Sequence, residues 1–144
     1  MKTRVLLADD HIVLLAALKQ QLEPVCDVVG TASDGRLLIS LAEKLQPDVI
    51  VADIYMPNLN GLEACHQLTR KAPDSRIIFL TVNEDRAMAE EAVRRGAFGY
   101  LLKNGAVAEL FEAIQTVVLG RVYITPAITE PVMCSSLARI NANA

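Results

Sequence analysis

The sequence contains no tryptophan, and aromatic residues make up only 4% of its 144 residues. Aromatic rings that stack on bases commonly line grooves for single-stranded nucleic acid, so this class of binding site is disfavoured. Basic residues are not in excess either, because the net charge is −3 and the isoelectric point is about 5.4. The chain therefore lacks the electrostatic footprint of a DNA- or RNA-binding domain.

The cysteines are few and widely spaced, at Cys26, Cys65 and Cys134. Their odd number and the lack of a Cys-x-x-Cys pair argue against a disulfide framework and a zinc site. No apolar run approaches the roughly 18 residues of a membrane span, and Asp9 interrupts the N-terminal run too early for a signal peptide. We therefore expect free thiols and a cytoplasmic location.

Glycine and proline are also scarce, which excludes collagen-like and low-complexity sequence. Hydrophobic residues make up 52% of the chain and charged residues 22%, so the chain is not intrinsically disordered. This length suits one domain with a core of its own.

Five short apolar runs alternate with segments of helical periodicity. The runs are aliphatic or β-branched with little polar alternation, which is typical of strands buried on both faces of a parallel sheet. They are Val5–Ala8, Val28–Ala32, Val49–Ala52, Ile77–Leu80 and Tyr100–Leu102. The first helical segment has apolar residues at Ile12, Leu15, Leu18 and Leu22. Asn60 and Glu63 have the spacing of a helix capping box.

This alternation predicts a doubly wound α/β fold with a five-stranded parallel sheet and five helices. Strand order 2-1-3-4-5 would make the first and third strands neighbours at the switch point, where such sheets bind their ligands. Asp9 and Asp10 follow the first strand, and Asp53 follows the third. Converging carboxylates repel one another unless a cation joins them. Mg²⁺ fits this set of oxygen ligands best.

Two further polar residues follow the remaining strands. Thr81 comes after the fourth strand and Lys103 after the fifth, so a hydroxyl and an ammonium would face the carboxylates. A carboxylate nucleophile, a metal ion, a hydroxyl and a lysine together describe a site that accepts a phosphoryl group on aspartate.

At this point the sequence resembles the receiver domain of two-component response regulators, over about residues 4–120. The motifs that carry the resemblance are Ala8-Asp9-Asp10-His11, Asp53-Ile54-Tyr55-Met56-Pro57, Leu80-Thr81-Val82 and Gly99-Tyr100-Leu101-Leu102-Lys103. The resemblance implies the flavodoxin-like (CheY-like) form of the fold. It implies further that the chain is not a dedicated enzyme, since it would catalyse only its own phosphorylation and dephosphorylation.

The resemblance assigns Asp53 as the phosphoacceptor. It also implies a Mg²⁺ site in which Asp10 binds the ion directly and Asp9 binds it through water. Asp53 would contribute one carboxylate oxygen to the ion, and Tyr55 its backbone carbonyl.

The remaining roles concern the response to the phosphoryl group. The resemblance implies that Lys103 pairs with the phosphoryl oxygens and that Thr81 forms a hydrogen bond to the group once it is present. Tyr100 would then change its packing and fill the space that Thr81 leaves. Val82 stands where many receivers carry a smaller residue, and we expect it to narrow access to Asp53. Tyr55 lies two residues beyond Asp53, and we expect its bulk to slow dephosphorylation.

The finer pattern is similar to the NarL/FixJ (LuxR-type) subfamily, in which a receiver precedes a helix-turn-helix domain. The run Leu119-Gly120-Arg121-Val122-Tyr123-Ile124-Thr125-Pro126 carries this similarity. It implies a receiver at residues 1–120 and a linker or tail at 121–144, with a short helix around Ile128–Leu137. The tail would lead to a C-terminal DNA-binding domain outside this chain. The implied partners are a sensor histidine kinase, a second copy in a homodimer, and DNA through that domain alone, with no membrane.

Other functions remain open on the sequence alone. A phosphohydrolase using Asp53 would lack a general acid, because Tyr55 stands two residues beyond the nucleophile. A nucleotide-binding domain would be expected to carry a glycine-rich phosphate loop, and only Gly30 and Gly35 stand near the second strand. A stand-alone or degenerate receiver that acts as an interaction or dimerisation module is the remaining alternative.

Overall fold

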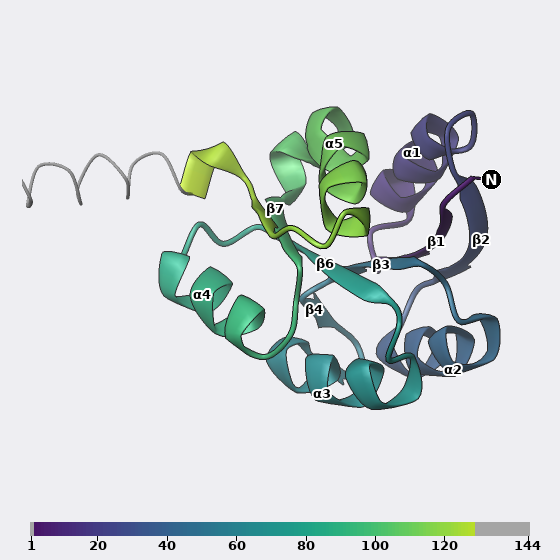
Figure 1. Ribbon diagram of the computed structural model, residues 1–144, viewed down its shortest axis with the longest axis horizontal. Coiled ribbons are helices and arrows are strands. Elements are labelled where there is room, and N and C mark those ends of the chain that lie inside the picture. Colours follow the sequence, from purple (N-terminus) through teal and green to yellow (C-terminus); the bar gives the residue numbers. More distant parts are fainter. Residues whose placement is uncertain (1, 129–144) are drawn as a thin grey trace, which may run out of the picture.

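The computed structural model describes residues 2–128 and contains one parallel sheet with helices on both faces (Figure 1). The strand order is β2-β1-β3-β6-β7-β8, and each neighbouring pair is parallel. The strands are β1 (Arg4–Ala8), β2 (Asp27–Ala32), β3 (Val49–Asp53), β6 (Arg76–Thr81), β7 (Gly99–Leu102) and β8 (Tyr123–Ile124). A small antiparallel hairpin, β4 (Tyr55–Met56) and β5 (Leu59–Asn60), follows β3.

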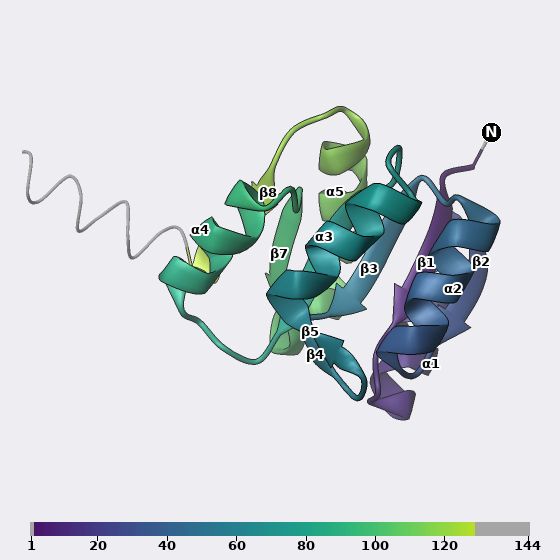
Figure 2. The same cartoon turned by 90° about the horizontal axis from the view of Figure 1, so that it is seen from below.

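The helices cover the sheet in two layers. Figures 1 and 2 show α1 and α5 on one face and α2, α3 and α4 on the other. The helices are α1 (Ile12–Leu22), α2 (Gly35–Leu45), α3 (Gly61–Lys71), α4 (Arg86–Arg94) and α5 (Ala106–Val118), with the short 3₁₀ helix η1 (Lys103–Gly105) before α5. The predicted doubly wound fold is confirmed. No described helix combines the length and apolar character needed to cross a bilayer.

Successive side chains along each buried strand point to opposite faces of the sheet, so the core has two layers. On β1, Val5 and Leu7 pack with α1 and α5, whereas Leu6 and Ala8 pack with the helices of the other face. Successive strand residues point to opposite faces, so a strand covered on both sides is apolar throughout. This explains why the predicted strands read as continuous apolar runs.

The sheet has one strand more than the sequence predicted. Residues 121–144 were expected to form a linker, yet Tyr123 and Ile124 form β8 beside β7. Gly120, at φ +82°, ends the helix and turns the chain back toward the sheet edge. The short helix predicted around Ile128–Leu137 falls outside the described residues, which end at Ile128.

The first turn of α1 differs from its predicted role. Periodicity placed Ile12 on the buried side of the helix, but its exposed fraction is 73%, and that of Val13 is 85%. Leu18 and Leu22 are buried as expected. Helical spacing predicts which side of a helix is apolar, but it does not predict how far the helix extends past the strands beneath it.

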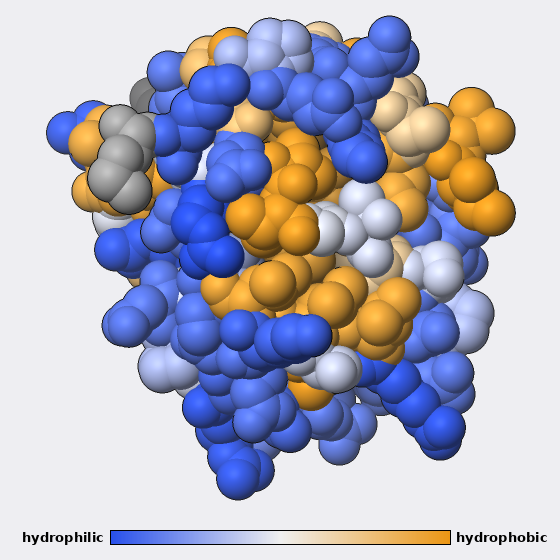
Figure 3. Space-filling view, turned by 90° about the vertical axis from the view of Figure 1, so that its right-hand side faces the viewer, coloured by the Kyte–Doolittle hydropathy of each residue, from blue (hydrophilic) through white to orange (hydrophobic). Residues whose placement is uncertain are grey.

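The two edges of the sheet differ in how far their strands are buried. Figure 3 faces the side where α1, β2 and α2 lie and shows apolar surface between hydrophilic flanks. Residues Val28 to Thr31 of the β2 edge strand are only partly buried. The opposite edge strand of the five, β7, is fully buried because β8 covers it.

Candidate functional site

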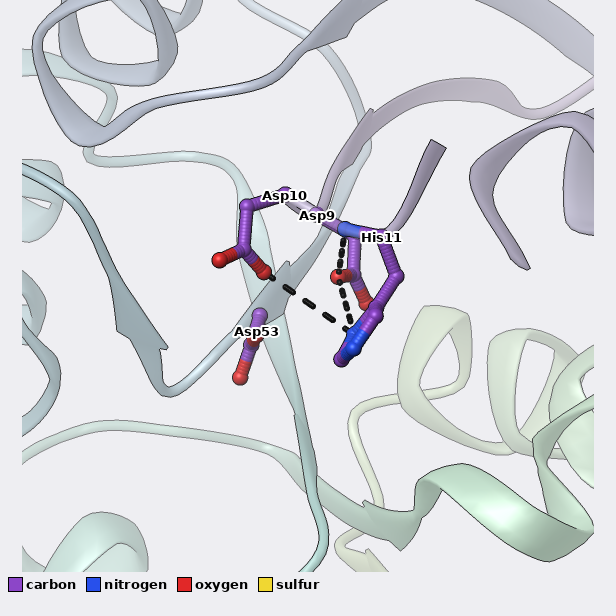
Figure 4. Close-up of side chains that lie close together, drawn as sticks. All are labelled: Asp9, Asp10, His11 and Asp53. Carbon is purple, nitrogen blue, oxygen red and sulfur yellow. Dashed lines mark hydrogen bonds and ion pairs between the residues drawn. The ribbon is translucent and has the colours of Figure 1, made fainter. Parts of the chain in front are cut away.

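The carboxyl ends of β1 and β3 bring the predicted acidic residues together. Ligand atoms of Asp9, Asp10, His11 and Asp53 all lie within 4.8 Å of one another (Figure 4). β1 and β3 are direct neighbours in the sheet, so their last residues meet at one edge. The structure therefore places the three aspartates as the sequence predicted.

Asp9 is completely buried, and only one of its two carboxylate oxygens accepts hydrogen bonds from described residues. Its Oδ1 accepts hydrogen bonds from the His11 backbone N–H, at 2.8 Å, and from the Lys103 ammonium, at 3.0 Å. Its Oδ2 is buried and has no hydrogen-bond partner among the described residues. A buried carboxylate oxygen without a partner is costly, so this atom suits a cation or a bound water.

Asp53 ends β3 and contacts the lysine at the end of β7. Its Oδ2 accepts a hydrogen bond of 2.7 Å from the Lys103 ammonium, and its Oδ1 accepts one of 3.0 Å from the Tyr55 backbone N–H. Lys103 also lies 3.0 Å from Asp9, so one ammonium bridges two buried carboxylates. The predicted approach of Lys103 to Asp53 across the sheet is thus present.

Burial and charge oppose each other at both ends of this ion pair. Burial raises the pKa of the Asp53 carboxyl, the Lys103 ammonium and the Tyr55 amide lower it, and the net pKa is raised. Burial lowers the pKa of Lys103, but its hydrogen bonds to Asp53 and Asp9 raise it by more. Lys103 therefore stays charged. The neighbouring Asp9 carboxylate still raises the pKa of Asp53, so some repulsion between these two carboxylates remains.

The acidic residues fit a hard divalent ion. Asp10 is the exposed member, with 41% of its side chain accessible, and can meet an ion from the solvent side. Asp9 offers its partnerless Oδ2, and Asp53 lies beside it. Mg²⁺ prefers one or two carboxylates together with waters and phosphate oxygens. These residues match that preference, whereas the predicted role of the Tyr55 carbonyl remains a prediction.

The sequence analysis gives His11 no role beyond closing the Ala8–His11 motif, and the structure places it against Lys103. His11 precedes α1 but makes no side-chain capping bond. Its Nδ1 lies 2.8 Å from the Lys103 ammonium and 3.4 Å from Asp9 Oδ1. The one sequence signal was its place directly after Asp10. His11 is therefore a third neighbour of the Lys103 ammonium.

Thr81 ends β6 and is buried at the same edge of the sheet. Its hydroxyl oxygen accepts a 3.0 Å hydrogen bond from the Asn83 backbone N–H. Because the oxygen acts here as an acceptor, the Thr81 hydroxyl keeps its proton for donation to another group.

Tyr100, the predicted switch residue, is fully buried. Its hydroxyl has no hydrogen-bond partner among the described residues. Burial raises the pKa of this phenol, and the neighbouring Thr81 hydroxyl lowers it. The ring therefore lies inside the core beside Thr81, and its change of packing remains a prediction.

Two residues that follow the site strands, Tyr55 and Val82, have exposed side chains. Tyr55 is 54% exposed and its hydroxyl donates to Met88 Sδ of α4, at 3.5 Å. Val82 is 78% exposed and lines a shallow apolar groove beside Asp10 and Lys103. The groove also includes Ile12, Val13, Leu14 and Ala17 of α1. The exposed first turn of α1 is therefore part of this groove.

Other strand-end and cap residues do not join the site. Asp34, which follows β2, accepts a 2.9 Å hydrogen bond from the Leu37 backbone N–H and caps α2. Asn60 precedes α3 as predicted, but its side chain makes no capping bond, so the predicted capping box does not form. Asp34 therefore serves local structure.

Comparisons with known proteins agree with this geometry. The model of the response regulator receiver domain matches residues 5–115. A crystal structure of a LuxR-family two-component response regulator from Aurantimonas sp. SI85-9A1 has a TM-score of 0.86 at 29% identity. That match covers 95% of this chain and 99% of the other.

Curated proteins with similar sequences are longer than this chain. The chain is 37% identical over 130 residues to the transcriptional regulatory protein DegU of Brevibacillus brevis. It is 39% identical over 135 residues to the nitrate/nitrite response regulator protein NarL of Escherichia coli K12. The matches cover 89% and 92% of this chain, but 55% and 62% of the relatives. The chain thus spans little more than half the length of these relatives.

Proposed function

Because the chain belongs to the family of response regulator receiver domains, we propose that Asp53 accepts a phosphoryl group from a sensor histidine kinase. The observation that carries the proposal is the Lys103 ammonium, which bridges buried Asp53 and Asp9 at 2.7 and 3.0 Å. An ammonium fixed at the acceptor carboxylate stabilises the charge of the transferring phosphoryl group without reorganising.

The chemistry follows from the residues that surround Asp53. An ionised carboxylate oxygen forms a bond to phosphorus, and the bond from phosphorus to the donor nitrogen or oxygen breaks. Lys103 exchanges carboxylate contacts for phosphoryl oxygens, and the Tyr55 N–H holds the acyl oxygen in place. Thr81 then donates its hydroxyl proton to a phosphoryl oxygen, and Tyr100 adjusts beside it. The chain acts as a switch, catalysing only its own phosphorylation and dephosphorylation.

The proposed cofactor is Mg²⁺, held by Asp10 and Asp53 directly, by Asp9 through water and by the Tyr55 carbonyl. Bound Mg²⁺ would neutralise charge on the carboxylates and on the phosphoryl oxygens. Without it, the entering phosphoryl group meets three carboxylates that are balanced by one close lysine. We expect chelation with EDTA to slow phosphorylation by acetyl phosphate at least about 100-fold.

Intact mass against time, with and without Mg²⁺, measures this effect. A second readout is thermal unfolding, because an ion that binds only the folded state raises the melting temperature. The rise should be large in the wild type and small in Asp10→Asn, which removes the negative charge of the exposed ligand. Equal phosphorylation rates in EDTA and Mg²⁺ would refute the proposed cofactor.

Tyr55 is proposed to slow hydrolysis of the aspartyl phosphate. Its backbone N–H donates to Asp53, and its half-exposed side chain forms a hydrogen bond to Met88 of α4. We expect Tyr55→Ala to shorten the phosphoryl lifetime roughly threefold to tenfold, because water reaches the acyl phosphate more easily. Decay of the adduct by mass spectrometry measures the lifetime, and Tyr55→Phe, which keeps the ring, serves as control. A lifetime that is unchanged or longer in Tyr55→Ala would refute this role.

The remaining proposals concern partners and output. The apolar groove of Ile12, Val13 and Val82 borders Asp10 and Lys103, so a kinase helix carrying phosphohistidine can dock beside Asp53. DegU and NarL are named as regulators, which supports transcriptional control as the output. We propose that DNA is reached through a C-terminal domain outside this chain, that the chain forms homodimers, and that it works in the cytoplasm.

A further inference from the structure

Residues 121–128, here called the C-terminal strap, follow α5 along the chain (Figure 1). Main-chain and side-chain hydrogen bonds attach the strap to the receiver. The Tyr123 backbone N–H donates to the Phe98 carbonyl at 2.8 Å, and the Thr125 N–H donates to the Tyr100 carbonyl at 3.0 Å. The strap therefore extends the sheet beyond β7, between α4 and α5 as Figure 2 shows.

One carboxylate holds two side chains of the strap. Glu109, in the first turn of α5, accepts a hydrogen bond of 3.0 Å from the Tyr123 hydroxyl. The Thr125 hydroxyl lies 2.9 Å from both Glu109 oxygens, and Thr125 is buried. Hydrogen bonds to a charged acceptor are among the stronger ones in proteins.

Apolar side chains attach the strap to both layers of the core. Tyr123 packs against the layer formed with α1 and α5. Ile128, which is buried, belongs to the layer that contains Tyr100, and Ile124 packs against that layer. Ile124 is also the register partner of Tyr100 across the two strands. The strap thus covers Tyr100, the residue that is expected to repack when Thr81 moves toward a phosphoryl group.

The strap has a second connection to the phosphorylation site, through Lys103. Lys103 begins η1, which leads directly into α5 and Glu109. A Cβ atom at Gly105 would lie 2.9 Å from Glu109 Oε2, so the carboxylate packs tightly over η1. A shift of Lys103 toward a phosphoryl group therefore moves the turn on which Glu109 rests.

We propose that the C-terminal strap is a latch that is docked when Asp53 is free and released when Asp53 is phosphorylated. This inference rests on the proposed function of Asp53. The phosphoryl group draws Thr81 and Lys103 toward it. Tyr100 follows Thr81 and withdraws from Ile124 and Ile128, while Glu109 loses its alignment with the strap. By linkage, a docked strap opposes phosphorylation by the same factor by which phosphorylation loosens the strap.

Hydrogen exchange on the whole chain tests the release. Beryllofluoride with Mg²⁺ serves as the phosphoryl mimic, and exchange of the peptide covering residues 121–128 is compared with and without it. We expect exchange in the strap to accelerate roughly fivefold to tenfold, whereas exchange in the β1 peptide, which the bound mimic stabilises, should not accelerate. Exchange that is unchanged or slower, while the mimic is bound, overturns the proposal.

Affinity for the mimic tests the reciprocal effect. ¹⁹F NMR of bound beryllofluoride gives its dissociation constant in the wild type, Ile124→Ala and the milder Tyr123→Phe. Both variants should bind the mimic more tightly, Ile124→Ala by the factor measured in exchange. Val122→Ala, which changes a half-exposed strap residue, should match the wild type. Equal affinity in all four proteins overturns the latch. Absence of any bound ¹⁹F signal in the wild type refutes the proposed function itself, and the latch with it.

Discussion

Replacing Asp53 with asparagine is expected to abolish the phosphoryl adduct that acetyl phosphate and Mg²⁺ produce on the wild type. The neutral amide is not a nucleophile toward phosphorus, whereas the carboxylate is. The substitution keeps the size of the side chain and an oxygen that can accept from Lys103. We therefore expect at least about a 100-fold loss of adduct in a folded protein, measured by intact mass.

A matched substitution separates this effect from general loss of an aspartate. Asp34 also follows a strand, but it caps α2 through the Leu37 N–H and lies outside the site. Asparagine caps helices as well as aspartate does, so Asp34→Asn should fold and accept the phosphoryl group normally. An adduct of wild-type yield on Asp53→Asn would move the acceptor elsewhere, whereas no adduct on the wild type would favour the alternative of a degenerate receiver.

The position of the site could be predicted because it follows from sheet topology. Parallel strands that are buried on both faces give continuous apolar runs, and the residues after each run lie at one edge. Asp9, Asp53, Thr81 and Lys103 were each found in this way. Their partners could be expected from the order of β1, β3, β6 and β7, since neighbouring strands place their last residues together.

The contacts that sequence reasoning missed depend on rotamers or on short pairings. The approach of His11 to Lys103 depends on side-chain torsions, for which a single sequence carries no periodic signal. β8 has only two residues and precedes Pro126, so its segment resembled a linker. It forms because β7 offers an unpaired edge and because Glu109 binds Tyr123 and Thr125. Such pairings are non-local, and local patterns do not predict them.

Removal of the Lys103 charge is the second large effect that we expect. Lys103→Met keeps the apolar stem of the side chain but removes the ammonium that lies 2.7 Å from Asp53 and 3.0 Å from Asp9. The rate of phosphorylation by acetyl phosphate should fall about 100-fold to 1,000-fold, as when one donor to a developing charge is lost. Asn104→Ala, which changes the exposed neighbouring residue, should leave the rate within about twofold of the wild type.

The same variant should be less stable when metal is absent. Two buried carboxylates then lose their shared cation, and breaking a buried ion pair commonly costs about 3 kcal/mol. Urea unfolding in EDTA measures this loss, and Mg²⁺ should recover part of it, because the ion replaces the missing positive charge. Stability recovered by Mg²⁺ while the phosphorylation rate stays low would show that Lys103 acts on the phosphoryl group itself. A rate close to that of the wild type would instead reduce Lys103 to a structural counter-ion for Asp9 and Asp53.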